Sequence, residues 1–423
     1  MTLVCAVTAC RFGFDEMPLP DVARITIQHG GSSDLGVVVG PNGFTCSSGT
    51  CTLEVDPGTP VTLRGLAADD AWFAGWTTNE CGGNFDCALQ ADGDITILAD
   101  FTPTPNRVFV TSTTTDAAFG GIAGADAICA ARATAANLSG TFIAFISDTT
   151  TNAATRLAGS RGWVRTDGAP FADAPTAFAN GKIVFPPRLD EYGNDLGNVP
   201  IYTGTNWGLT SASLCTNWTT NLVGQMGAMA NTEYASSSIG AGDRACSTMG
   251  HLLCVETGRI ITVATRPDTG KQAFSTKIPW VPGGGRASAD AHCASEAAAA
   301  GLTGDFLAAV ATTTESIESR FTAGDIYRRI DGVRLLRGAG ILAADWLDVP
   351  PEADQYGERV DRDLWTGVTR FNELPNAADN CSDWTVATVA QSGMMHFTTR
   401  TDVRSPTKTD LCSAAVSLLC LER

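Results

Sequence analysis

Residues 124–147 read GADAICAARATAANLSGTFIAFIS, and residues 288–311 read SADAHCASEAAAAGLTGDFLAAVA. A shift of 164 residues aligns the two stretches, and the same shift, which later becomes 166, aligns most of the chain that follows each of them. A constant offset over this length indicates an internal duplication. We therefore predict two copies of one domain at residues 107–256 and 271–423, joined by a linker at 257–270. Matched pairs outside the quoted stretches include Arg156 and Arg320, Asp190 and Asp354, Tyr192 and Tyr356, Cys215 and Cys381, and Trp218 and Trp384.

The two stretches predict the same elements in both copies. Each begins with a helix that carries the first cysteine of its copy. Asn137 and Gly301 stand at equivalent positions at the helix end, and both residue types readily take the left-handed conformation of a helix C-cap. A strand follows in each copy, then a long irregular stretch, and then a buried closing strand. The closing strands are predicted at HLLCVE (251–256) and SLLCLE (417–422).

The composition is that of an acidic globular chain. Of its 423 residues, 44% are apolar and 17% are charged, which argues against a disordered protein. With 28 Lys and Arg against 45 Asp and Glu, the formal net charge is −17. This charge argues against nucleic acid or an anionic membrane bound through a basic face. No run reaches the roughly 18 apolar residues that a membrane-spanning helix needs.

Residues 22–101 predict a small all-β module. Runs such as ARITIQ, PVTLRGLA and ITILADF are rich in β-branched residues and lie between turn-forming Gly, Pro, Asn and Asp residues. The following TPTPN, residues 102–106, predicts an extended and semi-rigid linker. We therefore place a domain boundary between the module and the first copy.

The cysteines predict disulfides rather than a metal centre. Of fourteen cysteines, twelve remain after Cys5 and Cys10, and they fall into three groups of four. They form no close CxxC pairs, and the chain has only four histidines, so a disulfide framework in an exported protein fits better than zinc. Each set of four allows three connectivities. Short separations favour local pairs in the module, and a first cysteine on the helix with a last on the closing strand favours nested pairs in the copies. The favoured pairs are Cys46–Cys51, Cys81–Cys87, Cys129–Cys254, Cys215–Cys246, Cys293–Cys420 and Cys381–Cys412.

The N-terminal segment, residues 1–21, is interpreted as a leader. Val7-Thr8-Ala9-Cys10 resembles a bacterial lipobox, which implies cleavage before Cys10 and a lipid on that residue, with attachment to a membrane. The alternative is that Cys5 and Cys10 are free or paired with each other at a frayed terminus.

Two further resemblances concern the fold. The module, with PGTPVTL, FAGW and a strand ending in ADF, resembles the divergent internalin-type B-repeat, which implies a small β-grasp-like sheet used as a spacer. The copies, with GGIAGADAICAARATAAN, CTNWTT and the weaker GGGRASADAHCASEAAAA and CSDWTV, resemble a bacterial surface-lipoprotein family of unknown function. That family is similar to the endostatin region of collagens and to the C-type-lectin-like fold. The expected fold class is therefore α+β, with two tandem lectin-like domains after an all-β module.

The resemblance does not imply a known ligand. Neither copy contains the EPN, QPD or WND triplets of calcium-dependent sugar-binding lectins. None of the histidines in the two copies, His251, His292 and His396, has a histidine at its equivalent position, so a catalytic histidine in both copies is excluded. We predict no catalytic residues.

The candidate site lies in the long irregular stretch, where carboxylates and aromatic residues gather. The predicted ligand-binding residues are Asp190, Tyr192, Asn206 and Trp207 in the first copy, and Asp354, Tyr356, Asp363 and Trp365 in the second. Calcium is the candidate cofactor, with Asp190, Asp354 and Asp361 as ligands. The alternative is that the repeated Asp-x-Tyr-Gly set only fixes the loop through turn hydrogen bonds. Trp218 and Trp384 are predicted to pack in the core.

These observations favour a non-enzymatic, exported cell-surface recognition or adhesion protein. Its partner would be an extracellular glycan or protein, bound by the long loops of both copies. A structural subunit of a self-assembling surface fibre or coat is the first alternative. An extracellular hydrolase that uses the loop carboxylates Asp190 and Asp354 is the second.

Overall fold

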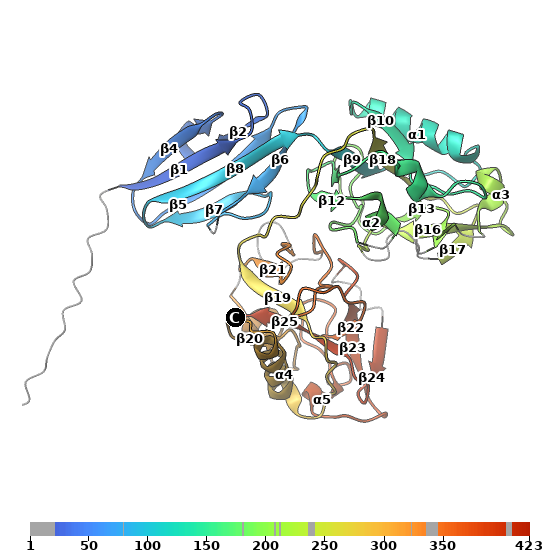
Figure 1. Ribbon diagram of the computed structural model, residues 1–423. Helices are drawn as coiled ribbons and strands as arrows, with labels where there is room; N and C mark the ends of the chain where they lie inside the picture. The colour runs from blue at the N-terminus through green and yellow to red at the C-terminus, as the bar shows by residue number, and fades with distance from the viewer. Residues whose placement is uncertain are drawn as a thin grey trace, which may run out of the picture.

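The computed structural model describes residues 22–78, 80–179, 182–206, 209–210, 213–235, 242–322, 324–335, 346–402 and 408–423. The predicted leader with Cys5 and Cys10 lies outside these ranges. Figure 1 shows three β-rich units in chain order, with one long helix in each of the last two. Strands outweigh helices in the described residues, which is compatible with the predicted α+β class and also with a mainly β fold.

The N-terminal module consists of two four-stranded sheets that share one hydrophobic core. The sheet orders are β4 (Thr50–Val55), β1 (Ala23–Gly30), β8 (Ile95–Pro103), β6 (Ala71–Trp76), and β3 (Thr45–Cys46), β2 (Gly36–Val39), β5 (Thr59–Ala67), β7 (Cys87–Ala91). Buried and less buried residues alternate along β1, because successive side chains of a strand point to opposite faces. Its inward residues Ile25 and Ile27 share the core with Leu63 and Phe101. The module therefore differs from the single small sheet that the resemblance implied.

Copies 1 and 2 are built from corresponding elements, and their bounds are as follows. Copy 1 contains β9 (Asn106–Val110), α1 (Gly121–Ala135), β10 (Thr141–Ala144), β11 (Trp163–Arg165), β12 (Pro170–Ala172), α2 (Pro175–Ala179), β13 (Pro200–Tyr202), β14 (Thr205–Asn206), β15 (Leu209–Thr210), α3 (Cys215–Trp218), β16 (Met226–Asn231), β17 (Gly242–Ala245) and β18 (His251–Thr257). Copy 2 contains β19 (Lys271–Ser275), α4 (Gly285–Ala299), β20 (Phe306–Ala308), β21 (Tyr327–Arg329), β22 (Asp363–Trp365), α5 (Cys381–Trp384), β23 (Ser392–Phe397), β24 (Lys408–Leu411) and β25 (Ser417–Glu422).

Apart from the edge strand β12 of copy 1, the described parts of the two copies have the same strand order, as a duplication requires. The main sheet of copy 1 runs β12-β11-β9-β18-β13-β16-β17, and that of copy 2 runs β21-β19-β25-β22-β23-β24. In both, the strand that follows the long helix also pairs with the closing strand, β10 with β18 and β20 with β25. The closing strands are buried along almost their whole length, as predicted.

The long helices end where the sequence predicted. Asn137 has a φ of 57° and Gly301 a φ of 71°, so different residues meet the same left-handed requirement. The next residue folds back in each copy, and Leu138 N donates to Ala133 O at 2.9 Å while Leu302 N donates to Ala297 O at 3.0 Å.

All six favoured disulfides are present. In each copy the outer bridge joins the long helix to the closing strand, and a pair of phenylalanines packs beside it. The ring centroids of Phe109 and Phe142 are 5.3 Å apart, and those of Phe274 and Phe306 are also 5.3 Å apart. This number of disulfides fits an oxidising environment outside the cytosol. Among the described residues, no helix has the length and apolarity to cross a membrane.

The module is docked onto both copies rather than held apart from them. The loop Cys81–Cys87 and the strands β6 and β8 make the contacts. Gly83 N donates to Pro267 O of the linker at 3.0 Å, and Asn84 Nδ2 donates to Gly168 O of copy 1, also at 3.0 Å. The Phe85 ring lies 5.6 Å from the Arg334 guanidinium of copy 2. The linker runs along the module on its way between the copies (Figure 1). The extended, semi-rigid linker predicted at 102–106 is packed, since Thr104 is 7% exposed.

Replacement of Gly83 by alanine should loosen this docking. The residue has a φ of +66°, and a Cβ there would lie 2.5 Å from the Asp268 carboxylate. Gly49→Ala is the matched control, since Gly49 has a φ of +61° with nothing within 4 Å of its Cβ position. Both variants carry the same backbone strain, about 1–2 kcal/mol. Small-angle X-ray scattering should show a larger radius of gyration for Gly83→Ala only. Equal values for the two variants would contradict this account.

His396 on β23 should make folding stability depend on pH. The side chain is buried, and burial lowers the pKa of its imidazole below the usual 6.5. The unfolded chain takes up a proton near pH 6.5 that the folded chain cannot, so stability falls as the pH drops below 6.5 towards the folded pKa. The slope can reach about 1.4 kcal/mol per pH unit. Urea unfolding between pH 7.5 and 5.5 should show a smaller loss for His396→Gln than for the wild type. His292→Gln, at a partly buried position of α4, controls for the loss of a histidine elsewhere in copy 2.

Candidate functional site

Each copy presents an exposed tyrosine on a tight turn, and we call residues 188–195 and 352–359 the tyrosine turns. Tyr192 is 54% exposed and Tyr356 is 53% exposed, whereas the preceding Asp190 and Asp354 are buried. The burial of an aspartate under an exposed aromatic ring is the shared feature of the two turns.

The buried aspartates hold the turns by hydrogen bonds to the backbone. Asp190 Oδ1 accepts from the amides of Tyr192 at 2.9 Å and Asn194 at 2.8 Å. Asp354 Oδ1 accepts from the amides of Tyr356 and Glu358, both at 2.9 Å. The glycine after each tyrosine has a positive φ, 84° and 78°, which explains why glycine occurs in both copies. This is the turn role that the sequence left as the alternative to calcium binding.

The ion pair at the base of the turn is reversed between the copies. In copy 1 Arg188 Nε lies 3.2 Å from Asp195 Oδ1. In copy 2 the equivalent residues are Glu352 and Arg359, and Arg359 Nη1 lies 3.0 Å from Glu352 Oε1. The same attraction closes both turns with opposite polarity.

The contact between the turn and the long helix has also been exchanged. In copy 1 Arg132 of α1 donates to the buried Glu191 at 2.6 Å, and Ser112 N donates to the same carboxylate at 2.8 Å. In copy 2 the equivalent of Arg132 is Glu296, which accepts from Gln355 Nε2 at 2.7 Å. The helix thus ties down the residue before the tyrosine in both copies.

The second oxygen of the buried aspartate has a different neighbour in each copy. Asn194 Nδ2 donates to Asp190 Oδ2 at 3.1 Å. In copy 2 the Lys277 ammonium lies 3.7 Å from Asp354 Oδ2 and 2.7 Å from Glu358. The hydrogen bond to Glu358 raises the pKa of Lys277, so this cation stays charged at neutral pH.

A cation also lies against each exposed ring. The Arg132 guanidinium is 5.9 Å from the Tyr192 ring centroid, and the Lys277 ammonium is 5.2 Å from that of Tyr356. The two cations come from different elements, α1 in copy 1 and the segment after β19 in copy 2. Contact with a cation restrains the ring and leaves part of it open to solvent.

Two other predicted site residues, Trp365 and Asp363, are engaged with partners other than these tyrosines. Trp365 is fully buried on β22, with its ring centroid 5.7 Å from that of Trp384. The prediction that Trp365 contacts a ligand is therefore wrong, because β22 lies between β25 and β23 in the core of copy 2. Asp363 pairs with Lys408 at 2.6 Å. The Asn206 side chain and Trp207 lie outside the described residues.

The calcium ligands remain unassembled among the residues that the structure describes. Asp190 and Asp354 are used by their own turns, and Asp361 is exposed. Within the described ranges, no three His, Cys, Asp or Glu side chains form a group that could hold a metal ion. Trp218 and Trp384 are buried as predicted, with their indole N–H groups donating to Ser147 O at 2.7 Å and Ala311 O at 2.8 Å.

A second repeated feature was not predicted: the short helices α3 and α5 are left-handed. Residues 215–218 have φ values of 48°, 53°, 52° and 64°, and residues 381–384 have 55°, 51°, 55° and 66°. None is a glycine, and the conformation costs about 1–2 kcal/mol per residue. A disulfide and a buried tryptophan hold each turn, Cys215 and Trp218 in copy 1. The only sequence signal is the repeated C-x-x-W.

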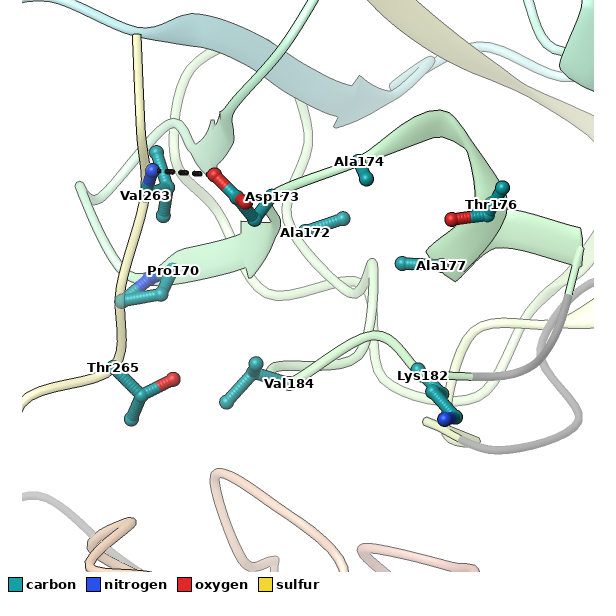
Figure 2. Close-up of a pocket in the computed structure, with 10 residues that line it drawn as sticks. All are labelled: Pro170, Ala172, Asp173, Ala174, Thr176, Ala177, Lys182, Val184, Val263 and Thr265. Atoms are coloured by element: carbon teal, nitrogen blue, oxygen red, sulfur yellow. Dashed lines mark hydrogen bonds between the residues drawn. The ribbon is translucent and has the colours of Figure 1, made fainter.

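The described residues of copy 1 line cavities at two places. One of about 540 Å³ adjoins α3 and is lined by residues that include Thr149, Ser213, Asn217 and Met226. Figure 2 shows the other, about 370 Å³, between β12, α2 and the linker. Its walls are mostly methyl groups, and its one carboxylate, Asp173, is engaged by Val263 N at 2.9 Å and by Arg161. The residues shown in Figure 2 contain no nucleophile paired with a base.

Comparison with protein-family models and with curated proteins found no match to this chain. The internal duplication therefore supplies the comparison between related sequences.

The exchanged helix contact can be tested by moving the copy 2 pair into copy 1. Arg132→Glu alone would place a second carboxylate beside the buried Glu191, and we expect a loss of about 3–5 kcal/mol in the free energy of unfolding. Addition of Glu191→Gln should recover most of it, because this pair then matches Glu296 and Gln355. Chemical denaturation of the wild type, both single variants and the double variant measures the coupling. Additive losses would show that the two positions are independent.

Proposed function

We propose that the chain is an exported, non-enzymatic recognition protein that binds an extracellular glycan or protein through its two tyrosine turns. The observation that carries this proposal is the presence of an exposed tyrosine at the same position of both copies. Asp190 and Asp354 are needed in both copies for the hydrogen bonds that hold the turns, and the glycines are needed for their positive φ. The part of each ring that is open to solvent, beyond its contact with Arg132 or Lys277, has no such reason from packing, whereas contact with a ligand supplies one.

The turns have the physical properties of a binding site. Tyrosine offers a large contact area and a polar hydroxyl at a low cost in conformational entropy. The hydrogen bonds from Asp190 and Asp354 fix the backbone beforehand, so that less order has to be created on binding. Two such sites in one chain add avidity when the ligand repeats. The net charge of −17 favours a neutral or basic ligand.

We further propose that the copies are C-type-lectin-like domains on a cell surface, with Cys10 as the lipid anchor. The nested disulfides and the helix packed beside the central strands support this assignment. The first and last strands of each copy are also paired, β9 with β18 and β19 with β25.

The test begins with the whole chain on an array of glycans and matrix proteins, once with calcium and once with a chelator. For a bound ligand, Tyr192→Ala and Tyr356→Ala should each weaken binding about tenfold, which corresponds to about 1.4 kcal/mol. The double variant should lose the avidity of the pair. Val389→Ala removes another exposed side chain, 71% exposed, and should bind as the wild type does. Full binding by the double tyrosine variant would overturn the proposal.

A structural subunit is the second candidate, and the exposed apolar loop tips favour it. Leu222 and Val223 are 63% and 75% exposed, and the position of Val223 is filled by the exposed Val389 in copy 2. Concentration-dependent assembly in light scattering, together with no ligand on the array, would favour this candidate over ligand capture.

A further inference from the structure

Arg188 at the base of the copy 1 tyrosine turn also binds copy 2. Its Nη1 donates to Leu347 O at 2.8 Å and to Thr401 Oγ1 at 2.9 Å. The guanidinium lies 5.2 Å from the Trp346 ring, and the side chain is only 5% exposed. One end of the guanidinium therefore closes the turn through Asp195, and the other end is held by acceptors of the second copy.

Copy 2 also contacts Glu233 of copy 1, and Glu233 binds the chain that leaves this turn. Asn198 Nδ2 donates to Glu233 Oε1 at 2.9 Å. The same carboxylate oxygen lies 3.6 Å from Arg400 Nε, and Thr401 Oγ1 donates to Glu233 O at 3.4 Å. Thr401 thus contacts both Arg188, before the tyrosine, and Glu233, which binds the segment after it.

The copy 2 turn is supported in a different way. Glu352, the equivalent of Arg188, is fully buried and is engaged within its own copy by Arg359 at 3.0 Å and Arg329 at 3.4 Å. Because copy 2 has a glutamate at the position equivalent to Arg188, it has no guanidinium there that could donate across to copy 1. The two turns therefore share a shape but differ in what holds them.

We infer that Arg188 is a positioning residue through which copy 2 fixes the Tyr192 turn, so that the order of this turn depends on the docking of the two copies. A buried guanidinium needs acceptors for its donors, and two of them come from copy 2. This inference deepens the proposed function, and its consequence for ligand binding rests on that function. A ligand that binds the ordered Tyr192 turn also favours the docked arrangement of the two copies, because such coupling is reciprocal. At the equivalent position of the Tyr356 turn, the ion pairs given for Glu352 come from Arg329 and Arg359 of its own copy.

Hydrogen exchange of the ligand-free full chain, followed by mass spectrometry, tests the coupling. Thr401→Val removes one acceptor of Arg188 and leaves the copy 1 sequence untouched. We expect exchange in residues 188–198 to become at least threefold faster, with residues 352–359 unchanged. The matched control is Thr366→Val, because Thr366 is a buried threonine of copy 2 whose hydroxyl donates to Val368 O at 3.1 Å.

A variant with the copy 2 pair in copy 1, Arg188→Glu with Asp195→Arg, provides the second arm. It keeps an ion pair at the base of the turn and removes the guanidinium that reaches copy 2. In this background Thr401→Val should no longer change exchange in residues 188–195, which Thr401 contacts through Arg188, whereas Asn198 is bound through Glu233. Unchanged exchange after Thr401→Val in the wild-type background, or equal acceleration by Thr366→Val, would overturn the inference. Since no ligand is used, this result is separate from the array test of the proposed function.

Discussion

The outer disulfide of each copy is the covalent constraint on which the rest of the domain depends. It joins the long helix to the closing strand, Cys129 to Cys254 and Cys293 to Cys420, across 125 and 127 residues. In the chain-entropy description, a bridge over this length stabilises the fold by about 4–5 kcal/mol. The closing strand pairs with the first strand of its copy, with the strand after the helix and with the strand after the tyrosine turn. A displacement of this strand would therefore disturb the helix, the sheet and the candidate site together.

Features with a local or repeated signal were predictable from the sequence. The duplication, the disulfide pairs, the helix ends at Asn137 and Gly301 and the buried Trp218 and Trp384 belong to this group. What escaped prediction depends on contacts between distant residues. An oxygen-rich neighbourhood suggested that Trp365 was exposed, but a strand with a neighbour on each side buries it. The docking loop at 81–87 and the left-handed turns carry no composition signal, because their conformations are imposed by partners far away in sequence.

The exchanges around the tyrosine turns show what has been kept since the duplication. Three supports have changed their chemistry: an ion pair has reversed, an arginine has become a glutamate, and an asparagine amide has been replaced by a lysine ammonium. In each case the contact in copy 2 supports the turn at the position that the different contact supports in copy 1. The shape of the turn, with its aspartate, tyrosine and glycine, has outlasted the groups that support it.

The disulfide arrangement also determines how the chain responds to mechanical load. When tension is applied between the two ends of the chain, the segments inside the outer bridges, 129–254 and 293–420, lie off the covalent path of the force. At about 3.5 Å per extended residue, each bridge withholds roughly 440 Å of contour length. The part that can lengthen is confined to the module, the linker and short flanking strands. Shear from flowing liquid would thus separate the docked units before it could unravel either copy. The Tyr356 turn would keep its form, whereas the Tyr192 turn would lose the contacts of Arg188 with copy 2.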